Sequence, residues 1–159
     1  MIILEAILMG ICATYFMDFF AGLLVKRNLI HSLIKPEVVG RWFLSMFRGK
    51  IIHKDIHETP ALNNEKFWCL LSHYLIGIVL AGIYLFLDLK EPIIRDLIWM
   101  PLIFGIATVL LPWLWLFPSM GLGFFASKSP NRSHIIRTSI VNHTNFGLGL
   151  LIWVLFIHG

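Results

Sequence analysis

The stretch FWCLLSHYLIGIVLAGIYLFL, from Phe67 to Leu87, decides the fold of this chain. It contains no Lys, Arg, Asp or Glu. A helix needs roughly 20 apolar residues to cross the hydrocarbon core of a bilayer, which is about 30 Å thick. The stretch therefore predicts a membrane-spanning helix, with one imidazole, His73, inside it.

Three further stretches are long and apolar enough to span a membrane, and they cover residues 2–25, 97–117 and 135–157. Over 159 residues the chain is 58% hydrophobic and 14% charged, whereas a soluble domain is about 25% charged. This composition excludes a cytosolic enzyme, a coiled coil, a disordered tail and a nucleic-acid-binding domain. We predict an all-α membrane protein in which four transmembrane helices form one antiparallel bundle, a single domain over residues 1–159 that has the lipid bilayer as its partner.

The basic residues are distributed very unevenly among the connections. Of the 13 Lys and Arg residues, eight lie between the first and second spans and three around the third connection. Only Lys90 and Arg95 lie in the second connection. Because cytoplasmic connections carry the excess of Lys and Arg, we expect the first and third connections in the cytoplasm and both termini outside it.

The first connection contains its own helical pattern over residues 36–52. Apolar residues recur there at helical spacing, and Arg41 lies on the opposite, polar face. A basic helix with an aromatic face is typical of the cytoplasmic membrane interface. We therefore predict an interfacial amphipathic helix, which could anchor the chain, contact lipid headgroups or cover a cavity.

The two halves of the chain resemble each other. His73 is followed by Gly77, and His143 by Gly147, at the same offset. The first span contains GICAT, ending at Thr14, and the third contains GIAT. Since each half would start outside, cross inward and return, the pattern indicates a possible parallel repeat of two helices.

Three spans place an ionisable side chain at a similar depth. Asp18 is eight residues before Lys26, His73 seven after Lys66, and His143 six after Arg137. At 1.5 Å per residue these depths are roughly 12, 10 and 9 Å. Around this layer lie side chains that can bond across helices, among them Thr14, Ser72 and Asn142.

This polar layer has three interpretations. It could be a structural network that fixes helix register. It could be a proton or ligand site, with Asp18 as its charge and Arg41 neutralising it from below. It could also be a haem site on His73 and His143, or a divalent metal site on those two and Asp18. No nucleophile–base pair is recognisable, so the sequence does not favour an enzyme.

Two further features concern shape and assembly. Pro112 lacks an N–H and cannot bond the carbonyl of Thr108, so we expect that oxygen to be free and the third span to kink. A four-helix chain is small for a transporter, and transport would require a homodimer. Small residues such as Ala6 and Gly10 would permit close helix contact in one.

Several motifs carry a resemblance over nearly the full length of the chain. They are ATYFMD from Ala13, VGRW from Val39, SHYLIG from Ser72, the proline–glycine run 112–123, the SPN turn at Ser129 and NHTNFG from Asn142. The chain resembles a bacterial family of small integral-membrane proteins classed as a domain of unknown function. The resemblance implies a four-helix protein of the inner membrane and supplies no reaction, substrate or protein partner.

Overall fold

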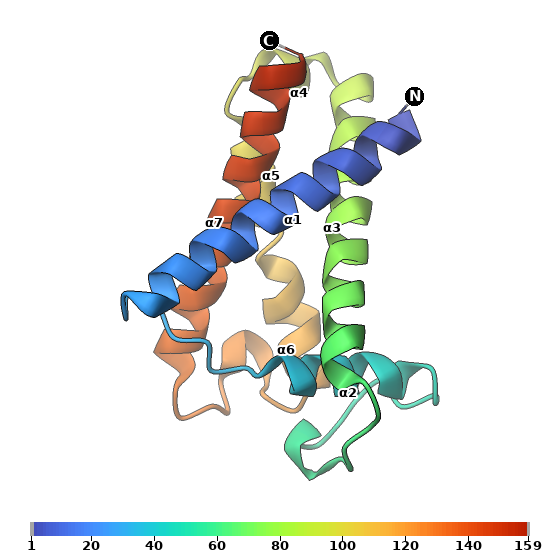
Figure 1. Ribbon diagram of the computed structural model, residues 1–159, viewed down its shortest axis with the longest axis vertical. Helices are drawn as coiled ribbons and strands as arrows, with labels where there is room; N and C mark the ends of the chain where they lie inside the picture. The colour runs from blue at the N-terminus through green and yellow to red at the C-terminus, as the bar shows by residue number, and fades with distance from the viewer. Residues whose placement is uncertain (1, 159) are drawn as a thin grey trace.

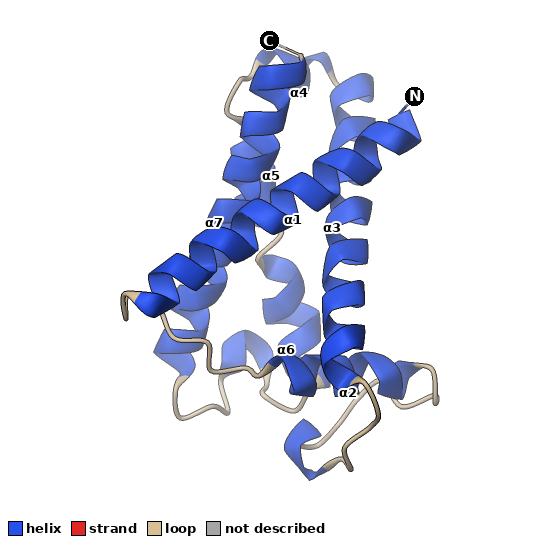
Figure 2. Cartoon of the chain, in the orientation of Figure 1, coloured by secondary structure: helices blue, strands red, loops and turns tan. Residues whose placement is uncertain are grey.

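The structure, a computed structural model, describes residues 2–158, the side chains at positions 92 and 95 excepted. Within that part of the chain every regular element is helical and no strand occurs (Figure 2). Four segments are long and apolar enough to cross a membrane: α1 (Ile2–Lys26), α3 (Glu65–Lys90), Met100–Ser119 and α7 (Arg132–Ile157). The prediction of an all-α membrane protein with four spans is confirmed.

The third span is not one continuous helix. It consists of α5 (Met100–Ala107), a π-helical turn η2 (Pro112–Leu116) and a short α6 (Phe117–Ser119). Pro112 begins the π turn, in which the N–H of Phe117 donates to the Pro112 carbonyl. The interruption that Pro112 predicts is present, but the carbonyl of Thr108 is not free. The N–H of Leu111 donates to it at 3.0 Å, because a tighter turn supplies the donor that proline lacks.

Four shorter elements complete the part of the chain that the structure describes: α2 (Pro36–Met46), η1 (Ile56–Glu58), α4 (Pro92–Asp96) and η3 (Phe124–Ala126). The helix predicted within residues 36–52 is α2, which ends at Met46. A turn follows Met46, where the N–H of Gly49 donates to the Met46 carbonyl. Gly49 then adopts a φ of 76°, a left-handed conformation that ends helices and that glycine adopts without strain.

Figure 1 shows α1 running obliquely across α3 and α7. α1 packs on both of these helices, and α5 packs on α7. Both termini lie at one end of the molecule, while α2 and the third connection lie at the other (Figure 1). We refer to this second end, which carries the first and third connections, as the basic end.

Glycines allow two pairs of helices to approach backbone to backbone. A Cβ on Gly10 of α1 would lie 2.4 Å from the Cα of Ile78, next to Gly77 of α3. A Cβ on Gly105 of α5 would lie 2.2 Å from the Cα of Gly147 of α7. Small residues at helix contacts are typical of membrane bundles. Each half thus has one such contact, at Gly77 and at Gly147, which have the same offset from His73 and His143, although the duplication itself stays a prediction.

The main apolar core lies where α1, α3 and α7 meet. Its buried side chains are Met9, Ala13, Met17, Ala81, Tyr84, Leu85, Phe146 and Leu150. The ring of Tyr84 also lies 5.5 Å from that of Phe104 in α5, so the third span joins the same core. The fold thus fixes the mutual positions of the spans that carry Asp18, His73 and His143.

Backbone hydrogen bonds join the first connection to the end of the third span. The N–H of His53 donates to the carbonyl of Ser119 at 2.8 Å, and that of Ile56 to the carbonyl of Met120 at 3.0 Å. Both His53 and Ser119 are buried. The basic end is therefore a packed layer in which two distant segments of the chain are tied together.

Candidate functional site

The first polar pair of the spans joins α1 to α3. Nε2 of His73 lies 3.1 Å from Oδ1 of Asp18. Both side chains are about two-fifths exposed, at 40% for His73 and 42% for Asp18. The structure thus brings together two of the three ionisable residues expected in one layer. It also leaves them accessible from outside the protein.

The second polar pair joins α7 to the end of α5. Nδ1 of His143 lies 2.7 Å from Oγ1 of Thr108, whose hydroxyl donates to the carbonyl of Gly105 at 2.5 Å. Because that hydroxyl has a single proton, it accepts from His143, which assigns the proton of a neutral imidazole to Nδ1. Nε2 of His143 then keeps a lone pair that a donor could use. His143 was predicted from the sequence as a polar-layer residue, whereas the hydroxyl of Thr108 was not, although the GIAT motif ending at Thr108 was the available signal.

The remaining polar residues expected near this layer differ in how they are bonded. The hydroxyl of Ser72 donates to the carbonyl of Cys69 at 2.9 Å, within its own helix. Oγ1 of Thr14, Oδ1 of Asn142 and Nδ2 of Asn145 are buried without a hydrogen-bond partner. Buried polar atoms are nearly always bonded to protein or water. These three atoms are therefore available to form hydrogen bonds with water or a ligand.

Arg41 has a different partner from the one considered in the sequence analysis. Its guanidinium donates to Glu65 at 2.7 and 3.1 Å and to the carbonyl of Thr59 at 2.8 Å. Arg41 and Glu65 are only 14% and 7% exposed, and the hydrogen bond with Glu65 raises the pKa of Arg41. Arg41 is thus committed to the packing of α2 on α3 and does not neutralise Asp18.

The geometry also bears on metal ligation. Among residues 2–158, apart from the two positions without described side chains, no three or more His, Cys, Asp or Glu side chains are grouped to hold a metal ion. Asp18 contacts His73, whereas His143 bonds to Thr108. The three ionisable residues therefore form two separate pairs and not one ligand cluster.

These features define a multi-pass helical membrane protein with a carboxylate–imidazole pair inside its spans. Residues 7–156 match the family described as a protein of unknown function, DUF2938. The chain belongs to this family, which confirms its resemblance to a domain of unknown function. No curated protein and no solved structure matches the chain. The inference of a function therefore depends on the geometry of the site.

Proposed function

We propose that this membrane protein binds or moves a proton or a small polar solute at a site centred on Asp18 and His73. The contact between these side chains, with each about two-fifths exposed, carries the proposal. Ionisable groups within membrane spans are costly and usually face the bundle interior or a water-filled cavity. Because an ionisable group facing lipid is costly, partial exposure of this pair favours contact with water or a solute, whereas an exposed apolar side chain can face lipid.

Neighbouring polar groups support the same function. Oγ1 of Thr14 and Oδ1 of Asn142 have no protein partner, and each could bond a water molecule or a solute. His143, paired with Thr108, provides a second imidazole within the spans. The proposed site thus combines Asp18 and His73 as ionisable groups with uncharged partners. It requires no nucleophile and no reaction step.

The topology that we propose follows from the basic residues. The connections with most Lys and Arg share one end of the molecule, and the two termini share the other (Figure 1). The excess of basic residues favours the basic end in the cytoplasm and the termini outside it, in the inner membrane of a bacterium. A homodimer formed at an exposed face of α1 would give the partly exposed Asp18 a protein environment.

Cysteine accessibility tests whether water reaches the site. In a chain with Cys12 and Cys69 replaced by alanine, His73→Cys should react with a membrane-impermeant thiol reagent applied from the basic end. The control is Ile76→Cys, on the same helix and 48% exposed, where lipid contact should prevent reaction. Equal protection of both cysteines would contradict the proposal of a water-accessible site.

Proton flux into liposomes that contain the purified protein tests movement through the site. Asp18→Asn should reduce proton flux, because the amide that replaces the carboxylate cannot take up and release a proton. Glu5→Gln is a matched control, since Glu5 is a second carboxylate of α1 that contacts an imidazole, that of His158, at the other end. If accessibility is absent and Asp18→Asn changes only thermal stability, the pair is structural and the proposal fails.

A further inference from the structure

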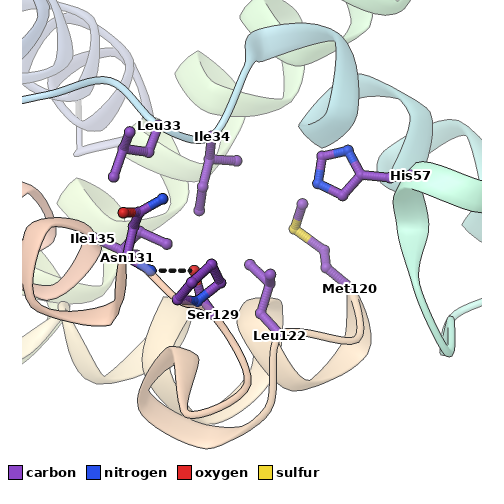
Figure 3. Close-up of a pocket in the computed structure, with 9 residues that line it drawn as sticks. Leu33, Ile34, His57, Met120, Leu122, Ser129, Asn131 and Ile135 are labelled. Carbon is purple, nitrogen blue, oxygen red and sulfur yellow. Dashed lines mark hydrogen bonds between the residues drawn. The ribbon is translucent and has the colours of Figure 1, made fainter.

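We propose that a cavity at the basic end binds the headgroup of an anionic phospholipid. The cavity has a volume of about 190 Å³. It lies between the segment that follows α1, the η1 turn, the third connection and the first turn of α7 (Figure 3). This site is separate from the Asp18–His73 pair, and none of its lining residues belongs to the polar layer of the spans.

The lining divides into polar and apolar parts. His57, Ser129 and Asn131 supply polar groups, and Figure 3 shows His57 and Asn131 facing the open space from opposite sides. The hydroxyl of Ser129 accepts from the backbone N–H of Asn131 at 3.2 Å, so its own proton remains available. The side chain of Asn131 makes no capping bond to α7. Two neutral donors therefore face a cavity whose other walls are apolar.

The apolar part suits a lipid and not a free anion. Its side chains are Leu33, Ile34, Met120, Leu122 and Ile135. Ile135 lies in the first turn of α7, where the chain passes from the basic connection into the apolar span. The cavity is therefore at the level of headgroups and of the first carbons of acyl chains. A phosphate from solution would gain nothing from these walls.

Charge favours an anionic headgroup. Lys35, Lys128 and Arg132 are exposed and directly adjoin three lining residues, Ile34, Ser129 and Asn131. The first turn of α7 holds no acidic residue, so no carboxylate there neutralises Arg132. Two acidic residues, Asp55 and Glu58, lie close to His57 in the chain, and the three basic residues outnumber them. Basic pockets at the cytoplasmic ends of helices bind anionic lipid headgroups.

The volume limits what the cavity can hold. About 190 Å³ is less than the roughly 300–1,000 Å³ of pockets for drug-sized ligands. A headgroup can enter such a space while its acyl chains stay in the bilayer along α7. We therefore assign the cavity to part of a lipid and not to a complete soluble metabolite.

Native mass spectrometry of the detergent-purified full chain tests the assignment. Phosphatidylglycerol should be retained in preference to phosphatidylcholine with identical acyl chains. The double variant Lys128→Gln/Arg132→Gln should lower phosphatidylglycerol retention by about thirtyfold, since each of the two basic side chains near an anionic surface contributes about 1 kcal/mol. Arg48→Gln is the matched control, because Arg48 is an exposed basic residue of the same end that, unlike Lys128 and Arg132, adjoins no residue lining the cavity.

Three outcomes would overturn the proposal: equal retention of the two lipids, an equal loss in Arg48→Gln, or displacement of phosphatidylglycerol by inorganic phosphate. Leu122→Trp, which fills the cavity without changing charge, should also lower retention and covers the case in which the double variant does not fold. Retention of phosphatidylglycerol at the wild-type level in folded Leu122→Trp would place the lipid elsewhere. None of these results depends on proton or solute movement at Asp18.

Discussion

The two halves of the molecule use the same helix contact and a different polar pair. In the first half Gly10 meets α3 beside Gly77, and in the second half Gly105 meets Gly147. Four residues before the second glycine of each contact, the returning helix carries a histidine, His73 or His143. His73 contacts the carboxylate of Asp18, whereas His143 contacts a hydroxyl.

The difference shows that two similar helix contacts can hold an imidazole beside different chemical groups, a carboxylate in one half and a hydroxyl in the other. With the threonines of GICAT and GIAT aligned, Asp18 corresponds to Pro112, which has no side-chain oxygen. The second half therefore draws the partner of its histidine from Thr108, at the break that Pro112 introduces. Of the two polar pairs, only the one in the first half contains a carboxylate. We therefore place the proposed function in the first half.

The largest expected loss of stability comes from disrupting the glycine contacts between helices, which both halves have. Gly10→Ala and Gly105→Ala place a methyl group 2.4 and 2.2 Å from the backbone of the facing helix. A backbone cannot move aside as a side chain can, so each variant should lose about 2–3 kcal/mol of stability. Thermal unfolding in detergent would measure the loss.

The matched control for these variants is Gly22→Ala. Gly22 also lies in α1, but a Cβ there meets nothing within 4 Å. Its stability should stay the same or rise slightly, because alanine favours helix over glycine. A loss in Gly22→Ala equal to that in Gly10→Ala would show that the helix contact is not the cause.

A smaller effect is expected from removing the neutral pair of the second half. Thr108→Val keeps the shape of the side chain but leaves the Nδ1 proton of His143 without its acceptor. An unsatisfied buried donor costs about 1–3 kcal/mol, and we expect about 1–2 kcal/mol here. A double-mutant cycle with His143→Ala isolates the pair, and additive losses would argue against coupling between them.

The link between the halves at the basic end should depend on pH. His53 is buried, with Nδ1 at 2.9 Å from Oγ1 of Thr59. Burial, with a smaller effect from Lys50, lowers the pKa of His53 from its ordinary value of 6.5. The ion pair of Arg41 with Glu65 reaches this region, because Arg41 also donates to the carbonyl of Thr59.

The folded chain disfavours the proton on His53. The contribution of neutral His53 to the stability of the fold is therefore fully present above the unfolded-state pKa of about 6.5. It is lost as the pH falls through 6.5 towards the lowered folded-state value. Unfolding temperatures between pH 8 and pH 5 should fall more for the wild type than for His53→Asn. We expect this difference to be smaller than the loss in Thr108→Val, and parallel curves would contradict the role of His53.

The smallest effect on stability is expected at the pair that carries the proposed function. Asp18 and His73 are each exposed by more than a third, and exposed ion pairs contribute at most about 1 kcal/mol. Asp18→Asn should therefore change the unfolding temperature less than Thr108→Val while it reduces proton flux. A loss of stability above that of Thr108→Val would indicate a structural pair and reverse the contrast between the halves.

Local sequence properties predicted the spans well. Apolar length is a property of each segment alone, and Phe67–Leu87 lies entirely within α3. The prediction was wrong at the carbonyl of Thr108, which Pro112 was expected to leave free and which accepts from the N–H of Leu111 at 3.0 Å. There a short-range backbone bond, which hydropathy does not describe, determined the structure.

The amino-acid sequence by itself determined that this is a four-span helical membrane protein, and it identified Asp18, His73 and His143 as ionisable groups at similar depth. Only the tertiary structure decided which of them meet. Counting residues gives the height of a side chain along its helix but not the direction in which it points relative to neighbouring helices. That direction depends on the glycine contacts between helices, which place His73 beside Asp18 and His143 beside Thr108. It likewise depends on the packing of α2 against α3, which pairs Arg41 with Glu65.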